Sequence, residues 1–240
     1  MYKDKKILGL IPARGGSKGL VGKNIIDMAG KPLIAWTIEC AQHSQYLDHL
    51  MVSTDDHQIA QVCRAYNAQV PFLRPSHLAS DTAASVDVVI HAIDWLSDKG
   101  HHYDYICLLE PTSPLREPFD IDDAIQQLID KPDAEAIVGI ALLESGHPEF
   151  NVVMDDQHFI SKYETGQTIK SLRRQDLEPV YFFEGTVYIS KISSLRKKMG
   201  FYHDRTMGYV VPRYKSIEID DRYDLIMAQA LLKDRMDRAK

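Results

Sequence analysis

The sequence predicts an α/β fold in which a mostly parallel sheet is covered by helices on both faces. Apolar runs typical of buried strands alternate with amphipathic stretches typical of helices, and the links between them are short. The 240 residues are 45% hydrophobic, which is enough for one large core. A glycine-rich loop directly follows the first apolar run, where a backbone can close on a ligand.

The elements follow from local signals. Pro32 marks the start of a helix, because proline needs no amide partner there, and Asp55 and Asp56 are capping residues for the next one. The predicted strands cover residues 7–11, 50–53, 69–73, 105–109, 136–141, 186–190 and 209–211. The predicted helices cover residues 33–42, a segment ending near 66, and residues 85–96, 121–129 and 221–238.

The loops after Ile11, Ser53, Leu73 and Leu109 should meet at one edge of this sheet. In open parallel sheets, ligands bind beyond the carboxyl ends of the strands. We therefore predict a Rossmann-like arrangement with the functional site at that edge.

The pattern changes from about Glu144 onward. Residues 151–154 and 158–162 look like a hairpin that turns at Asp155 and Asp156. This stretch is too short to fold alone. We predict a single domain over 1–240, with about 145–205 as an extension that lies over the site or pairs with another subunit.

Composition excludes several classes of protein. The net charge is −6 and no basic stripe is present, which argues against a nucleic-acid partner. No segment approaches the roughly 20 apolar residues of a membrane span, and the charged start leads straight into a strand, so we expect no secretory signal. The three cysteines fit buried thiols in the cytoplasm better than a zinc site.

The loop after the first strand is suited to a polyphosphate. Its glycines let backbone N–H groups approach an anion, and Arg14, Lys18 and Lys23 supply positive charge. It differs from the loop of nucleotide hydrolases and kinases, since the lysine is displaced by one residue and Asn24 replaces the magnesium-binding Ser or Thr. A solvated turn is the alternative.

Glu218 and Asp220 form a second candidate cluster. Alternate residues of a strand share a face, so both carboxylates should point the same way. Near a polyphosphate, two such groups could hold Mg²⁺. The alternative is a solvated acidic strand end.

Six motifs together resemble the CMP-sialic acid synthetases (acylneuraminate cytidylyltransferases). They occur in the order of that family and span most of the chain. The motifs are IPARGGSKG at 11–19 with Lys23-Asn24, STD at 53–55, LASDT at 78–82, PTSPLR at 111–116, RQD at 174–176 and SIEID at 216–220.

The resemblance implies a nucleotidyltransferase-type fold and transfer of CMP from CTP to a keto-deoxy sugar acid. It implies homodimers whose extension reaches the partner's site, with Mg²⁺ as cofactor. The implied catalytic residues are Arg14, Lys23 and Asp220. The implied nucleotide ligands are Arg14, Ser17, Lys18, Lys23, Asn24, Arg74 and Ser85. The implied sugar-facing residues are Glu110, Thr112, Ser113, Arg174, Gln175, Glu184, Tyr188, Phe201 and Tyr202. The implied metal ligands are Glu218 and Asp220.

Three carboxylates depart from the family pattern. That pattern usually has glutamine at Glu110, asparagine at Glu184 and aspartate at Glu218. An ionised carboxylate accepts hydrogen bonds but cannot donate them, so the changes at Glu110 and Glu184 bear on the sugar, whereas the longer side chain of Glu218 bears on the metal ligand. A nonulosonic acid is the expected substrate. An eight-carbon acid such as Kdo and a non-catalytic nucleotide-binding relative stay open.

Several of these residues also have purely structural interpretations. Ser85 could cap its helix, and Arg174 could form a surface ion pair with Asp176 or Glu178. Phe201 and Tyr202 could both belong to the core. Glu184 could turn away from the sugar and pair with Arg173.

Overall fold

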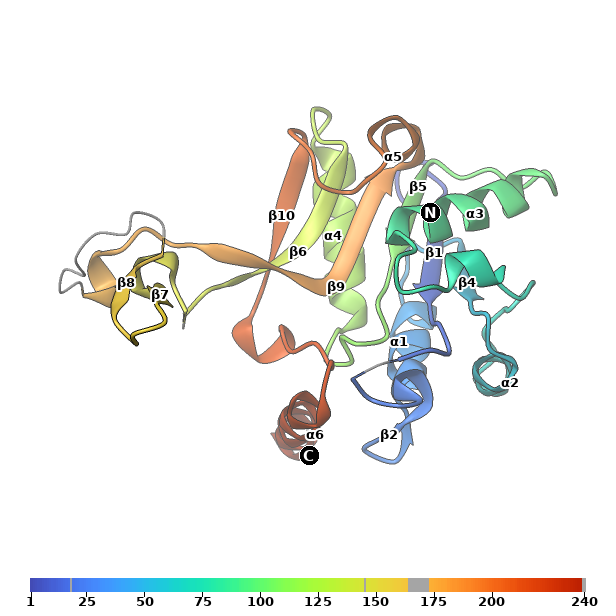
Figure 1. The fold of residues 1–240 in the computed structure, drawn as a ribbon. Coiled ribbons are helices and arrows are strands. Elements are labelled where there is room, and N and C mark those ends of the chain that lie inside the picture. Colours follow the sequence, from blue (N-terminus) through green and yellow to red (C-terminus); the bar gives the residue numbers. More distant parts are fainter. Residues whose placement is uncertain (18, 145, 164–172, 239–240) are drawn as a thin grey trace.

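A six-stranded mixed sheet forms the centre of the molecule (Figure 1). The computed structural model describes residues 1–17, 19–144, 146–163 and 173–238, and for Arg174 the backbone alone. The strand order is β10-β6-β9-β5-β1-β4. The bounds are β1 Ile7–Pro12, β4 His49–Ser53, β5 Tyr105–Leu108, β6 Ala136–Leu142, β9 Tyr181–Lys191 and β10 Thr206–Val211. Neighbours pair in parallel except at β9, which runs antiparallel to both β5 and β6. The mostly parallel sheet is confirmed.

Helices cover both faces of this sheet, and successive side chains of strand β1 pack alternately against the two layers. Ile7 and Ile11 pack with the cluster formed by α1, α2 and α4, whereas Leu8 and Leu10 pack with the cluster formed by α3 and α5. The helix bounds are α1 Leu33–Gln42, α2 His57–Ala65, α3 Ser85–Ser97, α4 Pro118–Asp130, α5 Ile192–Lys198 and α6 Arg222–Arg238.

Two predicted elements differ from the structure, and one helix was not predicted. Residues 69–73 form two isolated parallel bridges to the β4 side, Met51 to Gln69 and Thr54 to Leu73, and no continuous strand. Strand β9 is eleven residues long and extends beyond the predicted segment at its start, where its first residues are exposed and show no buried apolar run. Helix α5 was not predicted, since its last turn is basic and only a few of its residues are buried.

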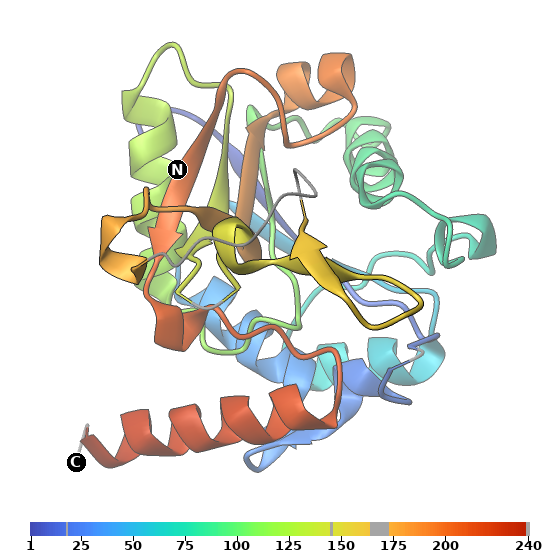
Figure 2. The same ribbon diagram turned by 60° about the vertical axis from the view of Figure 1, so that its left-hand side comes forward.

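The chain between β6 and β9 leaves the sheet as an arm, here defined as the described residues within 143–180 (Figures 1 and 2). The predicted hairpin is present: β7, Val152–Met154, pairs antiparallel with β8, Ile160–Lys162. Residues 181–198 of the predicted extension instead form β9, a central strand, and α5. The part that projects is therefore shorter than the sequence predicts.

The remaining short elements connect these parts. They are β2 Asp27–Met28, β3 Lys31–Pro32, η1 Lys23–Ile25, η2 Ser76–Leu78, η3 Pro148–Phe150, η4 Arg174–Asp176 and η5 Arg213–Lys215. Within the residues that the structure describes, no helix is both long and apolar enough to cross a membrane. Cys40, Cys63 and Cys107 are buried and free.

Candidate functional site

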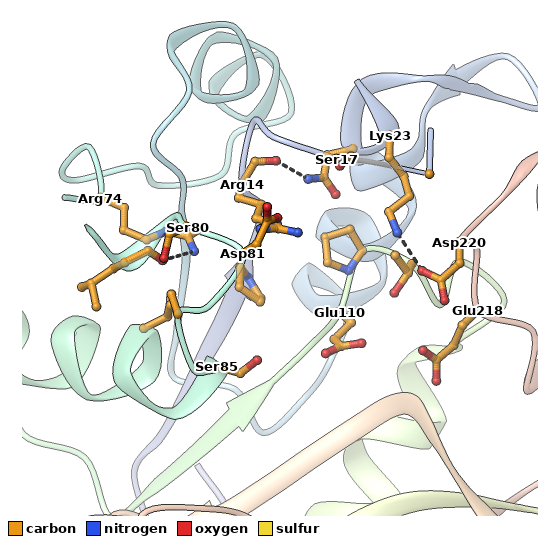
Figure 3. Close-up of a pocket in the computed structure, with 18 residues that line it drawn as sticks. Arg14, Ser17, Lys23, Arg74, Ser80, Asp81, Ser85, Glu110, Glu218 and Asp220 are labelled. Carbon is orange, nitrogen blue, oxygen red and sulfur yellow. Dashed lines mark hydrogen bonds and ion pairs between the residues drawn. The ribbon is translucent and has the colours of Figure 1, made fainter. Parts of the chain in front are cut away.

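A cavity of about 530 Å³ lies at the carboxyl-end edge of the sheet (Figure 3). The loops after β1 and β5, the loop that leads into α3, and the segment before α6 form its walls. Its charged and polar lining residues are Arg14, Ser17, Lys23, Asn24, Arg74, Ser80, Asp81, Ser85, Glu110, Thr112, Glu218 and Asp220. Most of the predicted site residues are thus brought together.

The loop after β1 is held by bonds to its own backbone. The buried Asn24 side chain donates to the Arg14 carbonyl at 2.9 Å, and the Gly15 amide donates to Asp55 at 3.0 Å. A Cβ on Gly19 would lie 2.3 Å from the Asp220 carbonyl oxygen, so only glycine lets these two segments approach so closely. This contact places the loop beside the acidic pair.

The two described cations of this loop are each paired with a carboxylate. Arg14 Nη1 lies 2.8 Å from Asp81 Oδ1, and Lys23 Nζ lies 2.9 Å from Asp220 Oδ1. The Asp81 and Asp220 side chains are 46% and 79% exposed, so an anionic ligand could displace them at low cost. Ser17 lines the same wall. Lys18 lies outside the described residues.

Arg74 braces the wall opposite Lys23. It is 6% exposed, and its guanidinium donates to the Ser53 carbonyl at 2.7 Å and to the Leu78 carbonyl at 3.3 Å. Burial lowers the pKa of Arg74. Arg74 therefore holds the backbone of the loop that follows β4, and its guanidinium group is not free to bind a ligand through both terminal nitrogens.

Ser85 is the first residue of α3 and lines the cavity. Ala84 occupies the cap position, and no side chain among the described residues caps this helix. The interpretation of Ser85 as a helix cap is therefore wrong, and its hydroxyl faces the cavity (Figure 3).

Glu110 and Glu218 converge at the other end of the cavity, over the backbone of Gly185. A Cβ on Gly185 would lie 3.1 Å from Glu110 Oε2, 3.2 Å from Glu218 Cδ and 2.5 Å from Ser113 Oγ. Burial raises the pKa of Glu110; burial, with Glu110 as neighbour, raises the pKa of Glu218 to about 7. Ser113 is fully buried and its hydroxyl has no hydrogen-bond partner among the described residues. This end of the cavity is acidic and poorly solvated.

Glu218 and Asp220 share a side, as predicted, although their segment is an extended loop and not a strand. Ile219 between them is fully buried, and its amide donates to the Thr112 carbonyl at 2.9 Å. Because Ile219 points into the core, both carboxylates point into the cavity.

Glu184 lies away from the cavity. It is fully buried, and its Oε2 accepts from the Thr186 amide at 3.1 Å and from the Thr186 hydroxyl at 2.6 Å. Its other oxygen occupies the space where a Cβ on Gly139 would be. Burial raises the pKa of Glu184 to about 7. Since Gly185 faces the cavity, the neighbouring Glu184 faces the opposite side of the sheet.

Arg116 is a buried residue whose role the sequence interpretation missed. Its Nη2 donates to the carbonyls of Glu110 and Gly185, both at 2.9 Å, and its other nitrogens bond to the Thr186 carbonyl and the Thr37 hydroxyl. It therefore joins the end of β5 to β9. The sequence did carry a signal for this role, because Arg116 ends the PTSPLR motif that follows the buried strand at 105–109.

The predicted aromatic pair divides between core and surface. Phe201 is 6% exposed and packs on Tyr188 with ring centroids 5.8 Å apart. Tyr202 is 53% exposed and packs against Phe183 with ring centroids 4.4 Å apart, and the sequence analysis did not single out Phe183. Burial, with Glu110 nearby, raises the pKa of Tyr188. The core interpretation is correct for Phe201 alone.

The remaining predicted sugar residues lie at two places. Thr112 lines the cavity. Gln175 is exposed on the arm, in the turn η4. The side chain of Arg174 lies outside the described residues.

Cations on one wall of this edge cavity and carboxylates on another make it a candidate site for an anionic ligand. The family described as cytidylyltransferase matches residues 8–228. The chain belongs to this family of nucleotidyltransferases.

Individual relatives are similar over nearly the whole chain. The CMP-N,N'-diacetyllegionaminic acid synthase of Legionella pneumophila subsp. pneumophila is 34% identical over 229 residues, which are 95% of this chain and 97% of that protein. A pseudaminic acid cytidylyltransferase of Campylobacter jejuni is 33% identical over 238 residues, covering 95% and 97%. An N-acylneuraminate cytidylyltransferase of Streptococcus agalactiae is 33% identical over 92% of this chain and 52% of its own length.

Solved structures share the fold. The CMP:2-keto-3-deoxy-manno-octonic acid synthetase complexed with CTP has a TM-score of 0.68 at 20% identity, over 96% of this chain and 99% of that chain. A 4-diphosphocytidyl-2C-methyl-D-erythritol synthase has a TM-score of 0.63 at 14% identity, over 95% and 100%. At these identities the likeness concerns the fold alone.

Proposed function

We propose that this enzyme transfers CMP from CTP to a nonulosonic sugar acid and releases pyrophosphate. The observation that carries the proposal is the division of one cavity into a wall with Arg14 and Lys23 and an end with Glu110 and Glu218. The names of the relatives, which include synthases of legionaminic and pseudaminic acid derivatives, support this class of acceptor. The anomeric hydroxyl oxygen attacks the α-phosphorus, its proton leaves to a base, and the bond to pyrophosphate breaks.

In this proposal Arg14 and Lys23 exchange their carboxylate partners for triphosphate oxygens. Charge then develops on the departing pyrophosphate, and cations held in place by the loop stabilise it without reorganising. Lys18 and Ser17 belong to the same loop and would contact the same oxygens. Asn24 acts indirectly, since its side chain is bonded to the Arg14 carbonyl.

The base of CTP would lie between Arg74 and Ser85. Cytosine offers an exocyclic amine and a carbonyl at its edge, which a hydroxyl and backbone groups can recognise. The Ser85 hydroxyl is available for this, and Arg74 holds the surrounding backbone.

We propose that Mg²⁺ binds at Asp220 and Glu218. The described residues contain no group of three or more potential metal-binding side chains, so the protein would supply at most these two carboxylates. That fits Mg²⁺, which typically takes one or two carboxylates and completes its shell with substrate phosphates and water. When bound, the ion would neutralise phosphate charge and lower the cost of bringing Glu218 and Glu110 so close.

Asp220 is also our candidate for removing the hydroxyl proton. Asp220→Asn keeps the size of the side chain and removes the charge, so we expect kcat to fall at least about tenfold. Pyrophosphate release measured with and without EDTA tests both roles. Full activity in EDTA, or in the variant, contradicts them.

The sugar acid would lie against Glu110, Thr112 and Tyr188, with Tyr202 at the rim. The buried Ser113 would lie beneath the sugar at this end of the cavity. The arm residues Arg174 and Gln175 would approach from a second subunit. Glu184 shapes the sheet beneath the site in this proposal and does not touch the sugar.

A homodimer is part of the proposal. The arm projects from the sheet and exposes apolar side chains, among them Val153, Phe159 and Ile160. Exposed apolar side chains gathered on a projecting segment are typical of a protein–protein contact. The free, buried cysteines fit a cytoplasmic enzyme.

Pyrophosphate release in the presence of CTP, Mg²⁺ and a panel of keto-sugar acids tests the function. We expect release with diacylated or acylated nonulosonic acids and little with the eight-carbon acid. Release without any sugar would indicate a hydrolase. No release with any acid, together with CTP binding, would indicate a non-catalytic relative.

A further inference from the structure

Lys215 is a buried cation that none of the roles above uses. It ends the turn η5, and its side chain is only 5% exposed. Lysine is almost never fully buried unless it is paired. Its surroundings therefore indicate why it is there.

Lys215 is paired with the first turn of helix α4. Its Nζ lies 2.9 Å from both carboxylate oxygens of Asp120 and also contacts Glu117. Asp120 further accepts from the Tyr209 hydroxyl at 3.2 Å and from the Glu117 amide at 2.8 Å. Burial alone would lower the pKa of Lys215, but these acidic partners raise it, so the lysine stays charged.

The pair joins two segments that carry the acidic end of the cavity. Lys215 precedes Glu218 by three residues in the segment before α6. Helix α4 directly follows the loop that carries Glu110 and Thr112. A second tie, from the Ile219 amide to the Thr112 carbonyl, joins the same two segments on the other side of Glu218. Glu218 is thus fixed between two attachments to the loop that carries Glu110.

A buried ion pair of this kind adds little net stability compared with apolar residues of the same shape, because both charges lose their hydration. What it does add is one defined distance between the two segments. From this geometry we infer that the Lys215–Asp120 pair is a positioning device, which sets Glu218 and Asp220 at the separation from Glu110 that a divalent cation and the acceptor require. The inference rests on the proposed function.

The test removes the pair without leaving a buried charge. In Lys215→Met with Asp120→Asn, both charges are absent and the volumes are kept. The readouts are the melting temperature, CTP binding without metal, Mn²⁺ binding to the CTP complex by electron paramagnetic resonance, and the kcat for pyrophosphate release. We expect a melting temperature close to native and unchanged CTP binding, with Mn²⁺ affinity and kcat each about tenfold lower.

Two further variants make the result decisive. Lys31→Met with Glu39→Gln removes a more exposed ion pair at α1, outside the cavity, and should leave all four readouts unchanged. Lys215→Arg keeps the charge but changes the length and shape of the tie, and should lower Mn²⁺ affinity several-fold with a native melting temperature. If the double variant does not fold, this variant decides.

An unchanged Mn²⁺ affinity in any folded Lys215 variant overturns the inference. So does the finding that the unmutated protein binds no Mn²⁺ in the presence of CTP. A native protein that binds Mn²⁺ and CTP but releases no pyrophosphate with any sugar acid would refute the proposed function alone. Native pyrophosphate release together with native Mn²⁺ binding in the variants would refute the positioning role alone.

Discussion

The two ends of the cavity differ in how their charged side chains are held and in how well they are solvated. At the cation end, Arg14 and Lys23 come from one short loop and are paired with largely exposed aspartates. At the acidic end, Glu110 and Glu218 come from segments far apart in sequence and lie in a poorly solvated place. The first end can exchange partners easily, as a site for a mobile polyphosphate must. The second needs fixed positions, which the buried cations Arg116 and Lys215 provide.

The largest effect should come from the cation end. Arg14→Ala or Lys23→Ala removes a charge aimed at the triphosphate, and we expect kcat/KM for CTP to fall by about a thousandfold, or about 4 kcal/mol. Because both side chains are paired only with exposed carboxylates, the melting temperature should hardly change. Steady-state kinetics and thermal melts measure this. Lys5→Ala, an exposed cation paired with Asp104, is the control.

Phe201 and Tyr202, near the acidic end of the cavity, should respond differently to substitution. Phe201→Ala empties space in the core of its own chain and should lower the free energy of unfolding by at least about 3 kcal/mol. Tyr202→Ala should leave stability nearly unchanged and instead weaken sugar use or dimer formation. Denaturant unfolding and light scattering separate the two outcomes. Equal losses of stability would show that both rings are core.

Glu184 gives a pH-dependent prediction. Its folded pKa of about 7 is above the ordinary 4.5, so the folded state holds the proton more tightly than the unfolded state does. Its contribution to stability is therefore lost as pH rises from about 4.5 to 7. Glu184→Gln abolishes this loss, so the variant should gain up to about 3 kcal/mol relative to native at pH 8 and little at pH 5. Equal pH profiles of unfolding would contradict the burial of a titrating carboxyl.

The smallest effect concerns sugar choice. In the proposed function Glu110 faces an anionic acceptor, so Glu110→Gln should raise kcat/KM for N-acetylneuraminic acid by about tenfold, or 1.4 kcal/mol. The Glu184 side chain is turned away from the cavity, so Glu184→Gln should leave the preference among sugar acids unchanged. Competition between two sugar acids measures it. A shift in the Glu184 variant alone would reverse these assignments.

The cation end could be predicted because its residues are contiguous. A strand, a glycine-rich turn and three cations specify their own neighbourhood, and alternation around Ile219 correctly aligned Glu218 with Asp220. The acidic end depends on the antiparallel course of β9, which no local pattern reveals. Whether Glu184 or Gly185 faces the cavity depends on the position of one residue in that strand. The roles of Arg116 and Lys215 depend on pairing between distant segments.

The most direct test of the two-ended cavity is a crystal structure of the protein with CTP and Mg²⁺. We expect the triphosphate between Arg14 and Lys23, with both ion pairs to Asp81 and Asp220 exchanged for phosphate oxygens. The base should lie against Ser85, and the space beside Glu110 should stay open for the acceptor. A triphosphate bound at any other place, with the Arg14–Asp81 and Lys23–Asp220 pairs intact, would contradict the account.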